Sequence, residues 1–98
     1  MAELNLSPAA RADLVDIRRV NMEQFGANVA DAYFLGFDEA FSLLRLHPEA
    51  GPEQQGLGKG IRCLVHRKHR IFYLLKGEIL LIVRIIYHAR NAKRTLRS

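Results

Sequence analysis

The spacing of apolar residues changes along this chain, and each change marks a predicted boundary. Residues 1–6 alternate small or apolar with polar side chains, the pattern of a short half-buried strand. Residues 8–47 place apolar side chains three and four positions apart and predict a helical hairpin. Residues 48–60 predict an exposed glycine-rich loop, residues 61–87 return to period two and predict a β-meander, and residues 88–98 form a basic tail. The predicted fold is α+β: a short N-terminal strand and an antiparallel two-helix hairpin packed on a three-stranded antiparallel meander.

The ends of both predicted helices carry local signals. Ser7 is a good N-cap because its hydroxyl can accept from a free backbone N–H, and Pro8 fits the first helical position, where no N–H is needed. Gly26 is suited to end the first helix. Asn28 is suited to cap the second helix, which ends near His47. Because so few residues separate the two helices, we expect them to be antiparallel neighbours.

Three strands are predicted in the second half of the chain, at Ile61 to His66, His69 to Lys76 and Glu78 to Tyr87. Two-residue turns between them predict that His66 pairs with His69 and that Leu75 pairs with Glu78. Side-chain alternation then assigns every strand residue to one of two faces of the sheet.

The two predicted faces differ in charge. The first is assigned to the core, with Arg70 as its only charge before the edge: Ile61, Cys63, Val65, Phe72, Leu74, Ile79, Leu81, Val83, Ile85 and Tyr87. The second is predicted to be open, apolar in its centre and cationic around it: Arg62, Leu64, His66, His69, Ile71, Tyr73, Leu80, Ile82, Arg84, Ile86 and His88. Such a face suits an amphipathic or acidic partner segment, because apolar burial supplies affinity and the cations supply orientation.

Charged residues are also sorted by position. Residues 1–56 contain nine acidic and four basic side chains, whereas residues 57–98 contain eleven basic side chains and one acidic. A cationic second half favours an anionic partner, either nucleic acid or an acidic protein segment. A solvated basic surface without a specific role would give the same pattern.

Length and composition restrict the class of protein further. The 98 residues suffice for a single domain with one core. No apolar stretch approaches the ~20 residues of a membrane helix, and the N-terminus lacks the basic-then-apolar order of a secretion signal. The single cysteine, Cys63, has no internal disulfide partner, so a cytoplasmic location is expected.

Arg62 and Arg84 are candidate binding residues, because both are assigned to the open face and a guanidinium is a planar bidentate donor for carboxylate or phosphate. The structural alternative is that they pair with acids of the helical hairpin, such as Asp13 or Glu39.

Three histidines, His66, His69 and His88, are assigned to the same face. A metal site made of nitrogen ligands alone, without support from cysteine or carboxylate, is uncommon. No metal and no cofactor are therefore predicted.

Four segments carry a resemblance to a known family. They are Leu6-Ser7-Pro8-Ala9-Ala10, Gly60-Ile61-Arg62, His69-Arg70-Ile71-Phe72-Tyr73 and Val83-Arg84-Ile85-Ile86-Tyr87-His88-Ala89-Arg90. Their order and spacing, from about Leu4 to Arg90, resemble those of the ParE/RelE superfamily of toxins from bacterial toxin–antitoxin modules, and within it the ParE branch.

The resemblance implies a compact toxin that forms a hetero-oligomer with a cognate antitoxin. Such an antitoxin has a ParD-like ribbon-helix-helix part that binds DNA, and an acidic, amphipathic C-terminal segment that wraps and neutralises the toxin. We expect this segment to bind residues of the open face: Arg62, Leu64, Ile71, Tyr73, Ile82 and Arg84. Arg84, His88 and Arg90 are expected to contact the target of the toxin.

The shared fold leaves more than one activity open. ParE-like toxins poison DNA gyrase, whereas RelE-like relatives are ribosome-dependent endoribonucleases that cleave messenger RNA. RelE-like enzymes typically add loop lysines and a C-terminal tyrosine to two arginines; here the loop has only Lys59, and no tyrosine follows His88. Gyrase inhibition without catalysis is therefore the favoured prediction, a ribonuclease is the alternative, and a non-toxic binding module is a third hypothesis.

Overall fold

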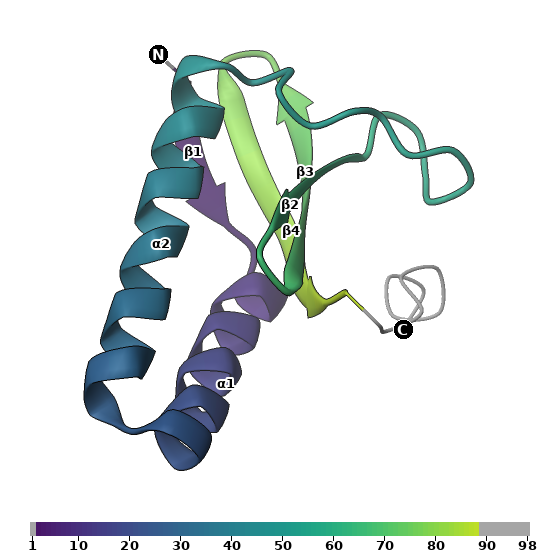
Figure 1. Cartoon of the computed structure of the whole chain (residues 1–98). Helices are drawn as coiled ribbons and strands as arrows, with labels where there is room; N and C mark the ends of the chain where they lie inside the picture. The colour runs from purple at the N-terminus through teal and green to yellow at the C-terminus, as the bar shows by residue number, and fades with distance from the viewer. Residues whose placement is uncertain (1, 89–98) are drawn as a thin grey trace.

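The computed structural model describes residues 2–88 and has the predicted α+β architecture (Figure 1). Its elements are β1 (Glu3–Leu6), α1 (Pro8–Phe25), α2 (Ala27–Leu46), β2 (Arg62–His66), β3 (His69–Lys76) and β4 (Ile79–Tyr87). The two helices form a hairpin whose junction projects beyond the strands. The predicted order of strand, helical hairpin, loop and meander is confirmed.

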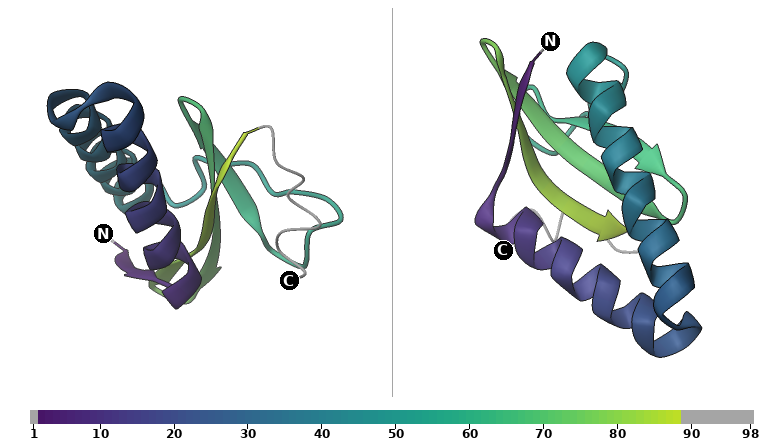
Figure 2. Two further views of the ribbon diagram at one scale, coloured as in Figure 1. Left: turned by 90° about the horizontal axis from the view of Figure 1, so that it is seen from below. Right: turned by 90° about the vertical axis from the view of Figure 1, so that its left-hand side faces the viewer.

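The four strands form one sheet with the order β1-β4-β3-β2. β1 runs parallel to β4, whereas the pairs β4–β3 and β3–β2 are antiparallel. Both helices lie on one side of the sheet, and the loop between α2 and β2 lies on the other side (Figure 2).

The helix ends follow local chemistry. The Ser7 hydroxyl accepts from the Ala10 N–H at 3.0 Å, as predicted for an N-cap, and donates to the Val83 carbonyl at 2.7 Å. This second bond ties the start of α1 to β4. The prediction that Asn28 caps α2 is wrong, because α2 begins directly after Gly26. Gly26 adopts φ 84°, which permits a reversal so sharp that no separate cap fits between the helices.

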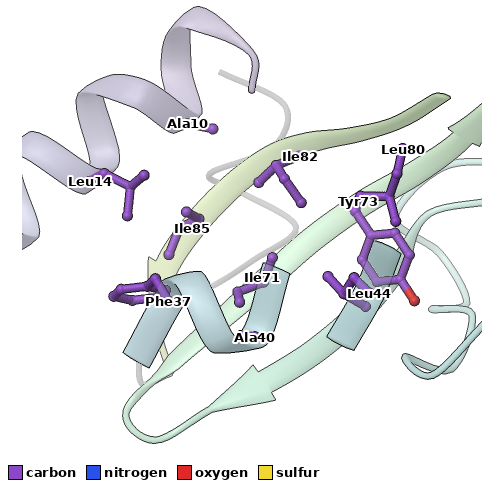
Figure 3. Packing of buried hydrophobic residues seen from close by; sticks show 10 residues of the cluster. All are labelled: Ala10, Leu14, Phe37, Ala40, Leu44, Ile71, Tyr73, Leu80, Ile82 and Ile85. Atoms are coloured by element: carbon purple, nitrogen blue, oxygen red, sulfur yellow. The ribbon is translucent and has the colours of Figure 1, made fainter. Parts of the chain in front are cut away.

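The main core lies between the helices and the sheet (Figure 3). Its buried residues come from both helices and from the two central strands: Ala10, Leu14, Phe37, Ala40, Leu44, Ile71, Tyr73, Leu80, Ile82 and Ile85. A smaller cluster contains Cys63, Phe72 and Ile86, with Leu57 and Ile61 packed against it. The sheet is therefore apolar on both faces.

This arrangement reverses the predicted assignment of the two faces for β2, for β3 and for β4 up to Ile82, whereas Ile85 lies in the main core as predicted. Ile71, Tyr73 and Ile82, predicted to lie on an open surface, are completely buried beneath the helices. Leu64 is half-buried against them. Val65, predicted to lie in the core, is 56% exposed. The prediction failed because alternation groups residues by face, but it does not say which face the helices cover when both are apolar.

β2 and β3 pair in the predicted register. In the β3–β4 hairpin, however, Lys76 lies opposite Ile79, so Gly77 and Glu78 form the turn. The predicted pairing of Leu75 with Glu78 is therefore wrong.

A β-bulge interrupts the ladder between β3 and β4. Tyr73 lies opposite Ile82 and Phe72 lies opposite Arg84, which leaves Val83 unmatched. One extra residue inverts the alternation of every residue that follows it.

The bulge separates the two candidate arginines. Residues directly opposite each other on paired strands share a face of the sheet. Arg62 lies opposite Tyr73, on the side that the helices cover, whereas Arg84 lies opposite Phe72. The prediction that Arg62 and Arg84 share one face is therefore wrong.

Candidate functional site

Arg84 is held by an acid of the helical hairpin. Its Nε and Nη2 atoms donate to the two carboxylate oxygens of Asp13 at 2.8 and 3.0 Å, and the Ile85 N–H donates to the same carboxylate at 2.9 Å. Only 21% of the Arg84 side chain and 12% of the Asp13 side chain are exposed. Hydrogen bonding to Asp13 raises the pKa of the Arg84 guanidinium above its ordinary value. For Arg84, the structural alternative of pairing with a helix acid is correct.

Arg62 and Tyr73 hold the loop that follows α2. Arg62 Nη1 donates to the Gly51 carbonyl at 2.8 Å and to the Glu49 carbonyl at 3.4 Å. The Tyr73 hydroxyl donates to the Pro48 carbonyl at 2.7 Å and accepts from the Gly51 N–H at 2.9 Å. Burial raises the pKa of this hydroxyl. Both side chains therefore organise the loop instead of facing an open surface.

The remaining predicted site residues do not form one surface either. Leu64, Ile71 and Ile82 pack in the main core. His88 is exposed at the end of β4, where its backbone N–H donates to the Lys68 carbonyl at 2.7 Å. Arg90 lies outside the described residues, as does the tail from residue 89 onward.

A groove near the junction of the helices offers a different site. It has a volume of about 520 Å³ and lies between α1, the N-terminal half of α2, the β2–β3 turn and the end of β4. Three of its apolar side chains are strongly exposed: Phe25 by 54%, Val29 by 50% and Tyr87 by 48%. Exposed apolar side chains gathered in a concave site are typical of a surface that binds a partner.

The charges available in this groove are positive. Asp13 is paired with Arg84, and Asp16 is paired with Arg19 at 2.7 Å, so both acids that line the groove are neutralised within the chain. Arg67 and Lys68, which form the β2–β3 turn, make no ion pair within residues 2–88. An anionic group entering the groove would therefore meet available cations.

A tyrosine–histidine pair lines the same groove. The Tyr33 hydroxyl of α2 is hydrogen-bonded to His69 Nδ1 of β3 at 2.5 Å. Burial raises the pKa of Tyr33, while burial and the neighbouring His66 lower the pKa of His69. The Arg67 guanidinium lies 5.6 Å from the centroid of the Tyr33 ring. These contacts join α2 to the β2–β3 hairpin.

His66 lies behind this pair. Its Nε2 atom is buried without a hydrogen-bond partner among the described residues, and its ring centroid is 4.9 Å from that of Phe37. Gly36 permits this approach, because a Cβ atom at that position would lie 2.9 Å from His66 Nε2. Burial, and then the charge of Arg67, lower the pKa of His66.

A second hollow, of about 720 Å³, lies near the end of α2. Its charged lining residues are Glu49 and Glu78, with His47 beside them. Two carboxylates make this hollow unsuitable for the acidic segment that the sequence predicts, so the groove at the helix junction is the better candidate.

Two classes of site find no support within the described residues. No group of three or more histidine, cysteine, aspartate or glutamate side chains gathers in residues 2–88 as a metal site would require. Neither α1 nor α2 is long and apolar enough to cross a membrane, and the described chain contains no further helix.

Sequence reasoning missed the groove because its walls come from segments far apart in the chain. One local signal was available: the turn Arg67-Lys68 lies between His66 and His69, in a position where glycine or asparagine is usual. Phe25 and Val29 flank the helix junction and are exposed. The sequence signal for them is weaker, since their positions also fit a buried helix face.

Comparisons with known proteins agree with this fold. Residues 4–92 match the family model of the ParE toxin of type II toxin–antitoxin systems, parDE. The chain is 28% identical to Toxin ParE1 of Caulobacter vibrioides over 96 residues, covering 98% of this chain and 99% of the relative. It is also 28% identical to Toxin ParE1 of Mycobacterium tuberculosis over 92 residues, covering 93% of this chain and 94% of the relative.

Solved structures extend the comparison. A chain of the chromosomal ParDE TA system from P. aeruginosa superposes with a TM-score of 0.77 at 24% identity, covering 89% of this chain and 96% of that chain. A copper-bound mutant toxin from Helicobacter pylori gives a TM-score of 0.63 at 21% identity, covering 91% of this chain and 97% of that chain. Because the family model covers most of the sequence, this chain belongs to the ParE toxin family of type II toxin–antitoxin systems.

Proposed function

We propose that this protein inhibits DNA gyrase and that a cognate antitoxin neutralises it by placing an acidic, amphipathic segment in the groove at the helix junction. Membership of the ParE toxin family supports the toxin role. The groove carries the proposal for the antitoxin, because it combines exposed apolar side chains with Arg67 and Lys68, cations that have no ion pair within residues 2–88.

The chemistry of the groove selects the kind of segment. Phe25, Val29 and Tyr87 can bury aliphatic or aromatic side chains of a partner, and Arg67 and Lys68 can receive its carboxylates. The partner is then a ParD-like protein with a ribbon-helix-helix part for DNA and a C-terminal segment of this composition, and the two chains form a hetero-oligomer. This groove replaces the sheet face on which the sequence placed the docking surface.

The two arginines that a phosphoryl-transfer site would need already have partners within the chain, which supports a mechanism of binding rather than catalysis. Arg84 is paired with Asp13, and Arg62 donates to loop carbonyls, so each already has partners within the chain. Cations that stabilise charge on a transferring phosphate must be available to that phosphate. We therefore expect the toxin to act on gyrase without cleaving nucleic acid itself.

A supercoiling assay tests the proposed target. The purified chain, added to gyrase and relaxed plasmid DNA, should inhibit supercoiling or accumulate cleaved DNA. The protein encoded by the adjacent reading frame, added beforehand, should restore normal supercoiling. If expression of the chain arrests growth but the purified chain leaves supercoiling unimpaired, gyrase is rejected as the target.

Ribosome-dependent messenger RNA cleavage is the second candidate, and one observation favours it. The Tyr33–His69 pair lies beside Lys68 in the groove, so a proton donor, a proton acceptor and a cation are close together. Under this alternative, expression of the chain degrades messenger RNA in translating extracts, and Tyr33→Phe prevents it. Under the gyrase proposal, messenger RNA stays intact.

A further inference from the structure

The two β-hairpin turns of this protein meet the same backbone requirement with different residues. Each turn has two residues, and each places its first residue in the left-handed region. In the β3–β4 turn this residue is Gly77, at φ 61°. In the β2–β3 turn it is Arg67, at φ 54°, the one residue other than glycine with positive φ among residues 2–88.

Arginine is an unfavourable choice for this position. A left-handed conformation brings Cβ close to the following carbonyl oxygen, which glycine avoids and which asparagine tolerates better than most residues. Two-residue hairpin turns are accordingly dominated by glycine, asparagine and aspartate. Gly77 shows that this chain uses the usual solution at its other hairpin.

The contacts of Arg67 within the described chain do not compensate for this conformation. Arg67 is exposed and makes no ion pair within residues 2–88. Its guanidinium lies 5.6 Å from the Tyr33 ring centroid, and such a contact contributes little at an exposed site. Strained residues of this kind are concentrated at binding and catalytic sites.

We infer that the Arg67 guanidinium binds a carboxylate of the antitoxin segment that occupies the groove. The inference rests on the proposed function. Arg67 lines the groove together with Lys68 and Tyr33. A guanidinium is a planar, bidentate donor that matches a carboxylate, and such charge-assisted pairs are stronger than neutral hydrogen bonds. The acids on the α1 side, Asp13 and Asp16, are already paired and do not compete for Arg67.

Substitution of Arg67 separates this role from a structural one. The test compares Arg67→Asn with Arg67→Lys, which keeps the charge but removes the planar donor. Lys76→Asn is the matched control, because it removes one positive charge beside the other hairpin turn, and Lys76 does not line the groove. For each variant, the melting temperature and the affinity for the protein encoded by the adjacent reading frame are measured.

Arg67→Asn should leave the melting temperature unchanged or higher, because asparagine suits the left-handed position. It should weaken antitoxin binding by about tenfold or more, since a charge-assisted pair is lost. The antitoxin affinity of Arg67→Lys should lie between those of the wild type and Arg67→Asn. The affinity of Lys76→Asn should be within about twofold of that of the wild type. Lys76→Asn should still act in the gyrase assay, because Lys76 does not line the groove.

Two results would overturn the inference. Unchanged affinity of Arg67→Asn would show that the guanidinium does not contact the partner. A melting temperature lowered by more than about 5 °C would show that Arg67 is retained for the fold. Failure of the wild-type chain to bind the adjacent protein at all would instead reject the proposed antitoxin, and the inference with it.

Discussion

Replacing Asp13 by alanine should destabilise this protein strongly, because Asp13 is the acceptor of a largely buried ion pair. Asp13 accepts three hydrogen bonds, two from Arg84 and one from the backbone of Ile85. The substitution leaves the guanidinium and the Ile85 N–H without these acceptors. It also removes the link between α1 and the part of β4 that follows the bulge.

The size of the effect follows from burial. Removing one partner of a buried ion pair costs about 3–5 kcal/mol, because the other charge stays buried without compensation. Arg84 is 21% exposed, so water can reach part of its guanidinium and the loss falls at or below the low end of that range. We expect a loss of about 2–3 kcal/mol in the free energy of unfolding, which corresponds to a melting temperature lower by roughly 8–24 °C.

Urea and thermal unfolding of Asp13→Ala measure this loss. Asp16→Ala is a control on the same helix: Asp16 pairs with Arg19, and the two side chains are 65% and 57% exposed, so the change should cost less than about 1 kcal/mol. Adding Arg84→Met to Asp13→Ala should recover part of the stability, since no charge is then left unpaired. Equal effects of Asp13→Ala and Asp16→Ala would refute the reasoning.

Two further predictions concern the histidines behind the groove. Gly36→Ala should lower the free energy of unfolding by about 1 kcal/mol, because its Cβ would lie 2.9 Å from His66 Nε2. In a His66→Ala background the same change should be stabilising, through helix propensity alone. Urea unfolding of the wild type, the two single variants and the double variant checks the reversal. Burial lowers the pKa values of His66 and His69, so the stability they contribute should be full above the unfolded-state pKa of about 6.5 and should fall as the pH decreases below it. Unfolding should therefore require less urea at pH 5.5 than at pH 7.5. His66→Leu should reduce this difference in stability between the two pH values.

Much of the fold follows from signals that act within a few residues. Ser7 and Pro8 mark the start of α1, and the helix begins there. The β2–β3 register follows from the two-residue turn between His66 and His69. Such features depend on backbone chemistry that the neighbouring side chains determine, so a single sequence suffices to predict them.

The assignment of the two sheet faces depends instead on contacts between distant segments. On the Tyr73 side of the sheet, apolar residues pack against the helices. On the Phe72 side, other apolar residues pack against Leu57 and Ile61 of the loop. Alternation alone cannot choose between them. The unmatched Val83 adds a second error, because nothing in its local sequence announces a bulge.

The sequence predicted the kinds of side chain in the candidate site but not where in the fold they lie. The sequence indicated cations beside apolar residues and a partner with the opposite character, and Arg67 and Lys68 beside Tyr87 have that character. It placed the cations on the sheet, however, where Arg62 and Arg84 turn out to hold the loop and α1. A charged side chain that a strand carries into a buried position needs such partners, because an unpaired buried charge is costly.

The β-bulge, the start of α1 and the charge of the groove are linked through hydrogen bonds. Ser7 binds the carbonyl of Val83, the residue that the bulge leaves unmatched, and so fixes where α1 starts along β4. From that start, Asp13 comes to lie beside Arg84 and neutralises it. The α1 wall of the groove therefore has no free charge at Asp13, whereas the β2–β3 turn opposite keeps the cation of Arg67. We expect an amphipathic segment to enter in one orientation only, with its carboxylates toward the turn and its apolar side toward α1.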